Sequence, residues 1–200
     1  MIEIPDVNGY FTHLSRTIQR LPFVTINQIA GTILNAYNRG RMIYLFGNGG
    51  SAALASHLAC DLGKGTVNGN GKRLRVMALT DNVPLMTAWA NDSKYEDIFA
   101  EQLSNMVDRD DIAFAISGSG NSPNVLRALQ VARKAGAVTV GLTGFQGGKM
   151  RELCDQCMIV PSDNMQIIED LHLCAAHAVF TTVRRKICHP AEASSAAASD

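Results

Sequence analysis

The sequence has no excess charge of either sign and little aromatic surface. Its 18 lysine and arginine residues balance 18 aspartate and glutamate residues, and tryptophan occurs once. A chain without net charge has no bulk electrostatic attraction to nucleic acid or to an anionic membrane, so neither is expected as a partner. Charged residues make up 18% and hydrophobic residues 46% of the chain, which is typical of a folded globular protein.

Long hydrophobic runs are also absent. No apolar stretch approaches the roughly 20 residues that cross a bilayer. The segment 1–7 carries Glu3 and Asp6 and lacks the apolar core of a signal peptide. We therefore expect a cytoplasmic protein.

Cysteine is odd in number, with five residues that lie mostly in apolar segments. Cys154 and Cys157 form a CxxC pair, a spacing found in zinc sites and in redox motifs. No second CxxC pair accompanies it, and Cys157 opens an apolar run typical of a strand. We therefore interpret these two residues as buried core thiols.

Short apolar runs alternate with amphipathic helical patterns along most of the chain. Strands that are apolar throughout are typical of a parallel sheet with helices on both faces, so the fold class is α/β. The expected strands are 42–46, 74–79, 112–116, 137–142 and 157–160. The expected helices are 7–21, 25–38, 51–62, 83–91, 95–106, 123–135, 149–154 and 164–187.

The chain shows no internal repeat and no linker, so we expect a single domain spanning 1–190. It comprises two N-terminal helices at about 7–38 and an α/β core at about 41–187. The two helices precede any strand, and they either cover the sheet or form an oligomer interface. The small, polar segment 191–200 is expected to be a disordered tail.

A glycine-rich turn follows the first expected strand. Gly47, Asn48, Gly49, Gly50 and Ser51 stand between this strand and a helix start. Glycines let a backbone approach a ligand closely, Ser51 can cap the helix, and the free N–H groups there suit an anion. A tight strand-to-helix turn without a ligand explains the same residues equally well.

A second polar loop, 117–122, follows the third expected strand. It holds three hydroxyl groups within six residues, from Ser117, Ser119 and Ser122. Hydroxyl and backbone donors without a lysine or arginine match a phosphomonoester. The loop is neither a P-loop nor a dinucleotide-binding fingerprint, because GK[ST] and G-x-G-x-x-G are both missing. A plain polar turn leaves the density of serines unexplained.

Acidic and imidazole groups lie on two of the expected helices. His57 and Asp61 share one helix face with Cβ atoms about 5–6 Å apart, which suits half of a metal site. A solvated polar pair explains them as well. The last helix carries Glu169 and His177, and His177 lies among small apolar residues, which is also compatible with a core position.

These segments together resemble the SIS (sugar isomerase) domain, and within it the phosphoheptose isomerases. The resemblance rests on GNGGSAALASHLACDL, ALTDNVPLMTAWAND and ISGSGNSPNVLRAL, and it continues in the same order through GLTGFQGGKMRELCD and VPSDNMQIIEDLHLCAAH. It covers about residues 8–187. It implies a three-layer sandwich with a five-stranded parallel sheet, and a homotetramer that uses the N-terminal helices in oligomerisation and has active sites between subunits.

The resemblance also implies one zinc ion per active site. Matched position by position, the ligands are His57, Asp61, Glu169 and His177. Asp61 stands where the family usually has Glu, and Glu169 where it usually has Gln. Residues eight apart on a straight helix lie about 12 Å apart along its axis, so we expect another subunit to supply either Glu169 or His177.

The remaining residues implied by the resemblance contact the substrate. Those for the sugar are Asn48, Gly49, Gly50, Ser51 and Asp92. Those for the phosphate are Ser117, Gly118, Ser119 and Ser122. Gly118 stands where the family commonly has Thr, and Gly65 where it has Arg. These departures predict a substrate that differs in its sugar or stereochemistry.

The implied reaction is aldose–ketose isomerisation of sedoheptulose 7-phosphate to D-glycero-D-manno-heptose 7-phosphate through an enediol, for activated-heptose biosynthesis. A base removes the proton beside the carbonyl, and an acid or metal stabilises the enediolate oxygen. The resemblance gives these roles to Asp61 and His177. Because Asp is one methylene shorter than Glu, Glu169 is the alternative base.

Two other functions remain open at this stage. One is a non-catalytic SIS protein that binds a sugar phosphate or a replication initiator. Such relatives tend to lack the catalytic pair, whereas this chain has His57, Asp61 and His177. The other is a metal-free SIS isomerase or deaminase that acts on amino-sugar phosphates.

Overall fold

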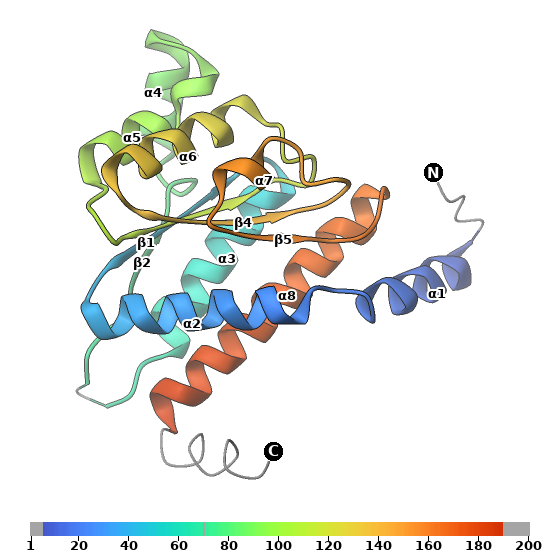
Figure 1. The fold of residues 1–200 in the computed structure, drawn as a ribbon. Coiled ribbons are helices and arrows are strands. Elements are labelled where there is room, and N and C mark those ends of the chain that lie inside the picture. Colours follow the sequence, from blue (N-terminus) through green and yellow to red (C-terminus); the bar gives the residue numbers. More distant parts are fainter. Residues whose placement is uncertain (1–5, 70, 190–200) are drawn as a thin grey trace.

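The computed structural model describes residues 6–69 and 71–189, so the expected tail at 191–200 lies outside the described residues. The five expected strands are β1 (Met42–Gly47), β2 (Arg75–Ala78), β3 (Ile112–Ile116), β4 (Val138–Thr143) and β5 (Gln156–Ile159). They form one parallel sheet in the order β2-β1-β3-β4-β5 (Figure 1). The expected parallel sheet is therefore confirmed.

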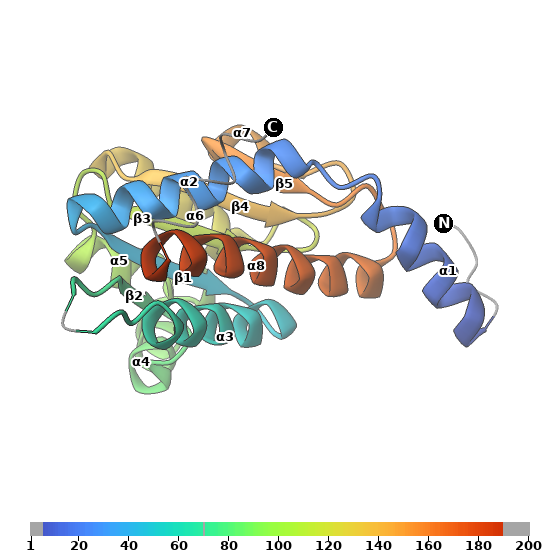
Figure 2. The same cartoon turned by 90° about the horizontal axis from the view of Figure 1, so that it is seen from below.

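Helices cover both faces of this sheet, as the three-layer prediction requires (Figure 1 and Figure 2). One face is covered by α2 (Phe23–Arg39), α3 (Gly50–Gly65) and α8 (Met165–Cys188). The other is covered by η1 (Tyr95–Asp97), α5 (Ala100–Met106), α6 (Pro123–Ala135) and α7 (Met150–Leu153), while α4 (Val83–Asp92) packs against η1 and projects away from the sheet. Side chains alternate along a strand, so Ile43 and Leu45 of β1 join the first core while Tyr44 and Phe46 join the second.

The strand order reverses direction between β1 and β3. From β1 the chain passes through α3 to β2 at one edge, and from β3 it passes through α6 to β4 on the other side. Gly47 pairs with Ile116, so β1 and β3 end side by side. This is a topological switch point, the place where open parallel sheets bind ligands. It brings the glycine-rich turn next to the polar loop 117–122, which we call the serine loop.

The two N-terminal helices have different surroundings. α2 packs on the sheet, and its Ile29 and Ile33 are fully buried. α1 (Val7–Ile18) extends past the end of the sheet and contacts α8 (Figure 2). Its Val7 and Phe11 are 72% and 60% exposed. Of the two expected roles, covering the sheet is therefore confirmed for α2, and the oligomerisation role stays a prediction.

One expected helix, 95–106, is wrong as a single element. The structure has the 3₁₀ turn η1 and then α5, with Ile98 and Phe99 between them. Both of these side chains are fully buried, and the Asp97 carboxylate is held by Arg127 at 2.9 Å. Core packing and this ion pair fix a bend that a helical pattern alone does not reveal. The other elements lie within a few residues of their expected ranges.

The cysteines are less buried than the sequence suggested. Cys154 and Cys157 are half-buried free thiols, while Cys60 and Cys174 are exposed. Hydrogen bonding to Cys157 and burial both raise the pKa of the Cys154 thiol. Cys154 packs against the second core, so the prediction of core thiols holds for this residue with partial burial. No helix in the described ranges has the length and apolar character needed to cross a membrane.

Close packing between α3 and α8 requires glycine at position 65. A Cβ atom added to Gly65 would lie 2.5 Å from Cζ of Phe180. The Phe180 ring thus occupies the space into which a side chain at position 65 would project. The family arginine expected near this position could not be accommodated without moving the ring.

We expect Gly65→Ala to destabilise the protein by about 1–3 kcal/mol, because overpacking forces side chains out of their preferred rotamers. Urea denaturation gives the change in the free energy of unfolding. Gly31→Ala is the matched control on α2, since a Cβ there meets no atom within 4 Å. In a Phe180→Leu background, the Gly65→Ala penalty should shrink; an unchanged penalty there would contradict the steric explanation.

Candidate active site

The glycine-rich turn after β1 is held in place by neighbouring side chains. Asn48 and Asn124 exchange two hydrogen bonds, of 2.9 and 2.8 Å, and the Tyr95 hydroxyl donates to Oδ1 of Asn48 at 3.1 Å. Gly49 has a φ of 55°, which favours glycine at the start of α3. Gly47 lies so close to β3 that a Cβ would be 2.6 Å from the Ile116 carbonyl oxygen.

The serine loop faces this turn across a small, polar cavity of about 140 Å³. The Ser117 and Ser122 hydroxyls lie 3.2 Å apart, and the Asn121 backbone N–H donates to Oγ of Ser119 at 3.2 Å. The cavity is lined by Asn48, Ser51, Ile116, Ser117, Gly118, Ser119, Ser122, Met165 and Glu169. Hydroxyl donors at the start of two helices give this cavity the chemistry of an anion site.

Met165 forms one wall of this cavity. A Cβ added to Gly118 would lie 2.5 Å from the Met165 sulfur, so the two residues occupy complementary space. The absence of a side chain at position 118 is thus matched by a bulky thioether from α8. Sequence reasoning noted Gly118 but missed Met165, which starts α8 without any polar signal.

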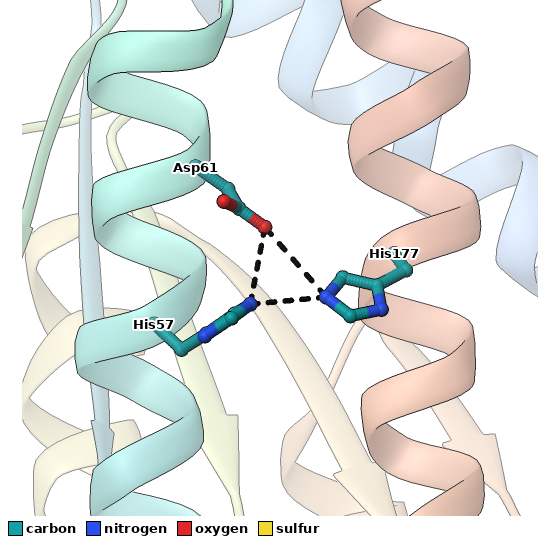
Figure 3. Close-up of side chains that lie close together, drawn as sticks. All are labelled: His57, Asp61 and His177. Carbon is teal, nitrogen blue, oxygen red and sulfur yellow. Dashed lines mark hydrogen bonds and ion pairs between the residues drawn. The ribbon is translucent and has the colours of Figure 1, made fainter.

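Three of the predicted metal ligands converge between α3 and α8. The Nε2 atoms of His57 and His177 are 3.0 Å apart, and Oδ2 of Asp61 lies 3.3 Å from His57 and 3.8 Å from His177. Figure 3 shows the three side chains pointing toward one another from the two helices. Their ligand atoms all lie within 4.8 Å of one another. We call these three residues the His–Asp–His group.

The His–Asp–His group fits a zinc ion in donor type and in spacing. Atoms bound to Zn²⁺ at about 2.0–2.1 Å in a tetrahedron lie about 3.3–3.4 Å from one another. The three separations of 3.0, 3.3 and 3.8 Å fall on either side of that value. Two imidazoles and a carboxylate are a ligand set found in catalytic zinc sites, which leave a further position open.

Glu169 does not join the His–Asp–His group. It lies two helical turns before His177 on α8, next to the start of α3, where a Cβ on Gly50 would be 3.2 Å from its Oε1. This matches the expected axial separation of residues eight apart. Within the described chain, the structure thus brings together three of the four predicted ligands and places the fourth at the glycine-rich turn.

A second cavity, of about 280 Å³, lies between α3 and α8. It is lined by Gly50, Ser51, Ala53, Leu54, His57, Glu169, Asp170, His172 and Leu173. We call this space the α3–α8 cavity and the smaller space at the serine loop the serine cavity. Ser51 and Glu169 line both cavities, so the two spaces adjoin. His57 links the larger cavity to the His–Asp–His group.

Two titratable groups of α8 near this cavity have defined partners. The Tyr10 hydroxyl donates to Oδ2 of Asp170 at 2.6 Å, and burial together with this bond raises the pKa of Tyr10 to about 12. Burial lowers the pKa of His172 to about 4, so its ring is neutral at pH 7. A hydrogen bond from this ring to the Thr143 backbone opposes the shift without cancelling it.

Asp92 is the predicted substrate residue that stands apart. It ends α4, is exposed, and accepts a hydrogen bond of 2.7 Å from Asn91. In the described part of the chain it lines neither of the two cavities. Sequence reasoning missed Asn124 and Tyr95, which fix Asn48. Only the position of Asn124 at a helix start next to the serine loop hinted at such a role.

The fold and these features define a class of protein. It is a parallel α/β protein in which loops suited to an anion lie at the switch point, beside helices that carry the His–Asp–His group. A family profile described as the SIS domain matches residues 9–144. A phosphoheptose isomerase from Paramagnetospirillum magneticum is 43% identical over 164 residues, covering 82% of this chain and 83% of that protein. One from Aliarcobacter butzleri is 41% identical over 150 residues, covering 75% and 79%.

Solved structures agree with the sequence comparison. The phosphoheptose isomerase from Neisseria gonorrhoeae has a TM-score of 0.82 and 28% identity, covering 88% of this chain and 96% of its own. That from Francisella tularensis has a TM-score of 0.85 and 28% identity, covering 93% and 100%. The chain belongs to the SIS domain family and, within it, to the phosphoheptose isomerases.

Proposed function

We propose that this protein isomerises sedoheptulose 7-phosphate to D-glycero-D-manno-heptose 7-phosphate. The observation that carries the proposal is that Ser51 and Glu169 line both the serine cavity and the α3–α8 cavity. A phosphate bound by the serine loop would direct the sugar chain into the neighbouring space, beside Glu169 and His57. The shared lining supports a site in which one phosphorylated sugar contacts both the serine loop and the residues beside the His–Asp–His group.

Glu169 is the better candidate for the base. Its carboxylate has no hydrogen bond or ion pair within the described residues, whereas Asp61 lies beside two imidazoles. In the proposed reaction Glu169 takes the proton from the carbon beside the carbonyl and returns it to the neighbouring carbon. His177 is the candidate acid for a reaction without a bound metal, because an Nε2 atom that binds zinc has no proton to donate.

His57, Asp61 and His177 would hold the zinc ion that the family resemblance implies. A zinc ion bound there supplies Lewis-acid stabilisation of charge that develops on a substrate oxygen. The expectation that another subunit contributes Glu169 or His177 to the ligand set stays a prediction. The exposed apolar side chains of α1 support self-association through this helix, since a second subunit would cover them, and the homotetramer stays a prediction.

Incubation with sedoheptulose 7-phosphate tests the function directly. We expect the aldose to accumulate, and a zinc chelator to reduce its rate of formation. Turnover of another ketose phosphate without any turnover of sedoheptulose 7-phosphate would overturn the substrate. The non-catalytic alternative gains no support, because the His–Asp–His group and Glu169 are both present.

A further inference from the structure

Asn124 fixes the orientation of the Asn48 amide in the glycine-rich turn. The backbone N–H of Val125 can only donate, and the Asn124 atom that it meets at 3.0 Å is therefore the amide oxygen, Oδ1. The same oxygen accepts from Nδ2 of Asn48 at 2.9 Å, and Nδ2 of Asn124 donates to Oδ1 of Asn48 at 2.8 Å. Turning the Asn48 amide over would set donor against donor and acceptor against acceptor.

The Tyr95 hydroxyl completes the hydrogen bonding of the Asn48 oxygen. It donates to Oδ1 at 3.1 Å, so this oxygen has two donors, the number that its two lone pairs can accept. Nδ2 of Asn48 carries two N–H groups, and within the described residues it uses one of them, on Asn124. The side chain of Asn48 can therefore offer a ligand one further donor and no acceptor.

Asn48 can meet a ligand directly, whereas the two residues that hold its amide stand behind it. Asn48 is half-buried and lines the serine cavity together with the hydroxyls of the serine loop. Among the described residues that line this cavity, neither Tyr95 nor Asn124 occurs. An effect of Tyr95 on a phosphate in the serine cavity therefore acts through Asn48.

The 3₁₀ turn η1, which carries Tyr95, is itself held by α6. Asp97 of η1 is 4% exposed and pairs with Arg127 at 2.9 Å. Arg127 lies three residues after Asn124, so α6 presents these two side chains on the same side. One helix thus places both partners of the Asn48 oxygen, although Tyr95 is 56% exposed.

We propose that Tyr95 is a positioning residue whose hydroxyl holds the Asn48 amide as a hydrogen-bond donor to the phosphorylated sugar. This inference rests on the proposed function and deepens it. The ligand atom that meets the free N–H must be an acceptor, which an oxygen of the phosphate or of the sugar provides. A hydroxyl hydrogen of the sugar finds no free acceptor on this side chain.

Tyr95→Phe removes the hydroxyl and keeps the ring. Oδ1 of Asn48 then has a single donor, so the amide is held less firmly. We expect KM for sedoheptulose 7-phosphate to rise about 3-fold, within the range of one hydrogen bond, with kcat nearly unchanged. Because Tyr95 is exposed, the free energy of unfolding in urea should stay as in the wild-type protein.

Tyr37→Phe is the matched control for the loss of a tyrosine hydroxyl. The Tyr37 hydroxyl donates to the Lys72 backbone carbonyl at 3.2 Å. In the described part of the chain, neither of these residues lines the serine cavity or the α3–α8 cavity. This substitution should leave KM unchanged.

A double-mutant cycle with Asn48→Ala separates a positioning role from a direct contact. Asn48→Ala removes the amide and should raise KM about 10-fold. Adding Tyr95→Phe to that variant should raise KM no further, because the hydroxyl then has no amide to hold. A further rise of about 3-fold in the double variant would show that Tyr95 acts by another route, and would overturn the inference. So would an unchanged KM in Tyr95→Phe alone.

NMR of ¹⁵N-asparagine-labelled wild-type protein tests the inference even if Asn48→Ala does not fold. Sedoheptulose 7-phosphate should shift the side-chain N–H₂ resonances of Asn48. Inorganic phosphate should shift them too if the acceptor is a phosphate oxygen, and should not if it is a sugar oxygen. Resonances that stay unmoved with bound sugar phosphate, while turnover proceeds, defeat only the role of Tyr95 and Asn48. Shifted resonances without turnover defeat only the proposed isomerase.

Discussion

Replacing Glu169 by Gln should lower kcat for sedoheptulose 7-phosphate by about 1,000-fold, within the range that general acid–base catalysis contributes. The amide has nearly the same shape as the carboxylate but cannot accept the proton from the carbon beside the carbonyl. Gln is also a competent zinc ligand, so the zinc content should stay as in the wild-type protein. The rate of aldose formation and metal analysis measure the two effects.

Glu152→Gln is the control for this substitution, because Glu152 is an exposed carboxylate on α7. It should leave kcat unchanged. The competing assignment makes Asp61 the base. It would be correct if Glu169→Gln kept the wild-type rate while Asp61→Asn lost activity with its zinc retained.

Replacing His177 by Ala should weaken zinc binding by about 100-fold or more. Removing a residue that only orients a ligand already costs about 10- to 100-fold in metal affinity, so loss of a ligand should cost no less. Only His57 and Asp61 would then remain of the His–Asp–His group. Competition with a chelating dye measures the dissociation constant, and wild-type protein should bind about one zinc ion per chain.

His189→Ala is the control for His177→Ala, since this exposed histidine follows the same helix. It should bind zinc like the wild-type protein. Wild-type affinity in His177→Ala would show that the metal, if bound, lies elsewhere. Loss of zinc with full retention of activity would instead show a metal without a role in the reaction.

The sheet and its ligand-binding edge could be predicted because their sequence signals are local. Each strand is a short apolar run, and the polar loops follow β1 and β3 directly. Parallel strands place their carboxyl ends at one edge, so the meeting of Ser51 with the serine loop follows from the strand order. His57 and Asp61 could be paired because they are one helical turn apart.

Contacts between distant segments could not be predicted in the same way. Nothing near Gly118 or Gly65 indicates that Met165 and Phe180 fill the space beside them, because each pair is set by how α8 lies on the sheet and on α3. Asp92 was matched by motif alone, and its distance from the cavities depends on how α4 projects from the sheet (Figure 1).

The helix α8 supplies a whole side of the candidate site from one continuous stretch. Met165, Glu169, His172, His177 and Phe180 all belong to it, and the glycine and serine loops belong to other segments. A library of variants confined to residues 165–180 would therefore change the side chains that α8 presents to a ligand, while the glycine-rich turn and the serine loop keep their sequence.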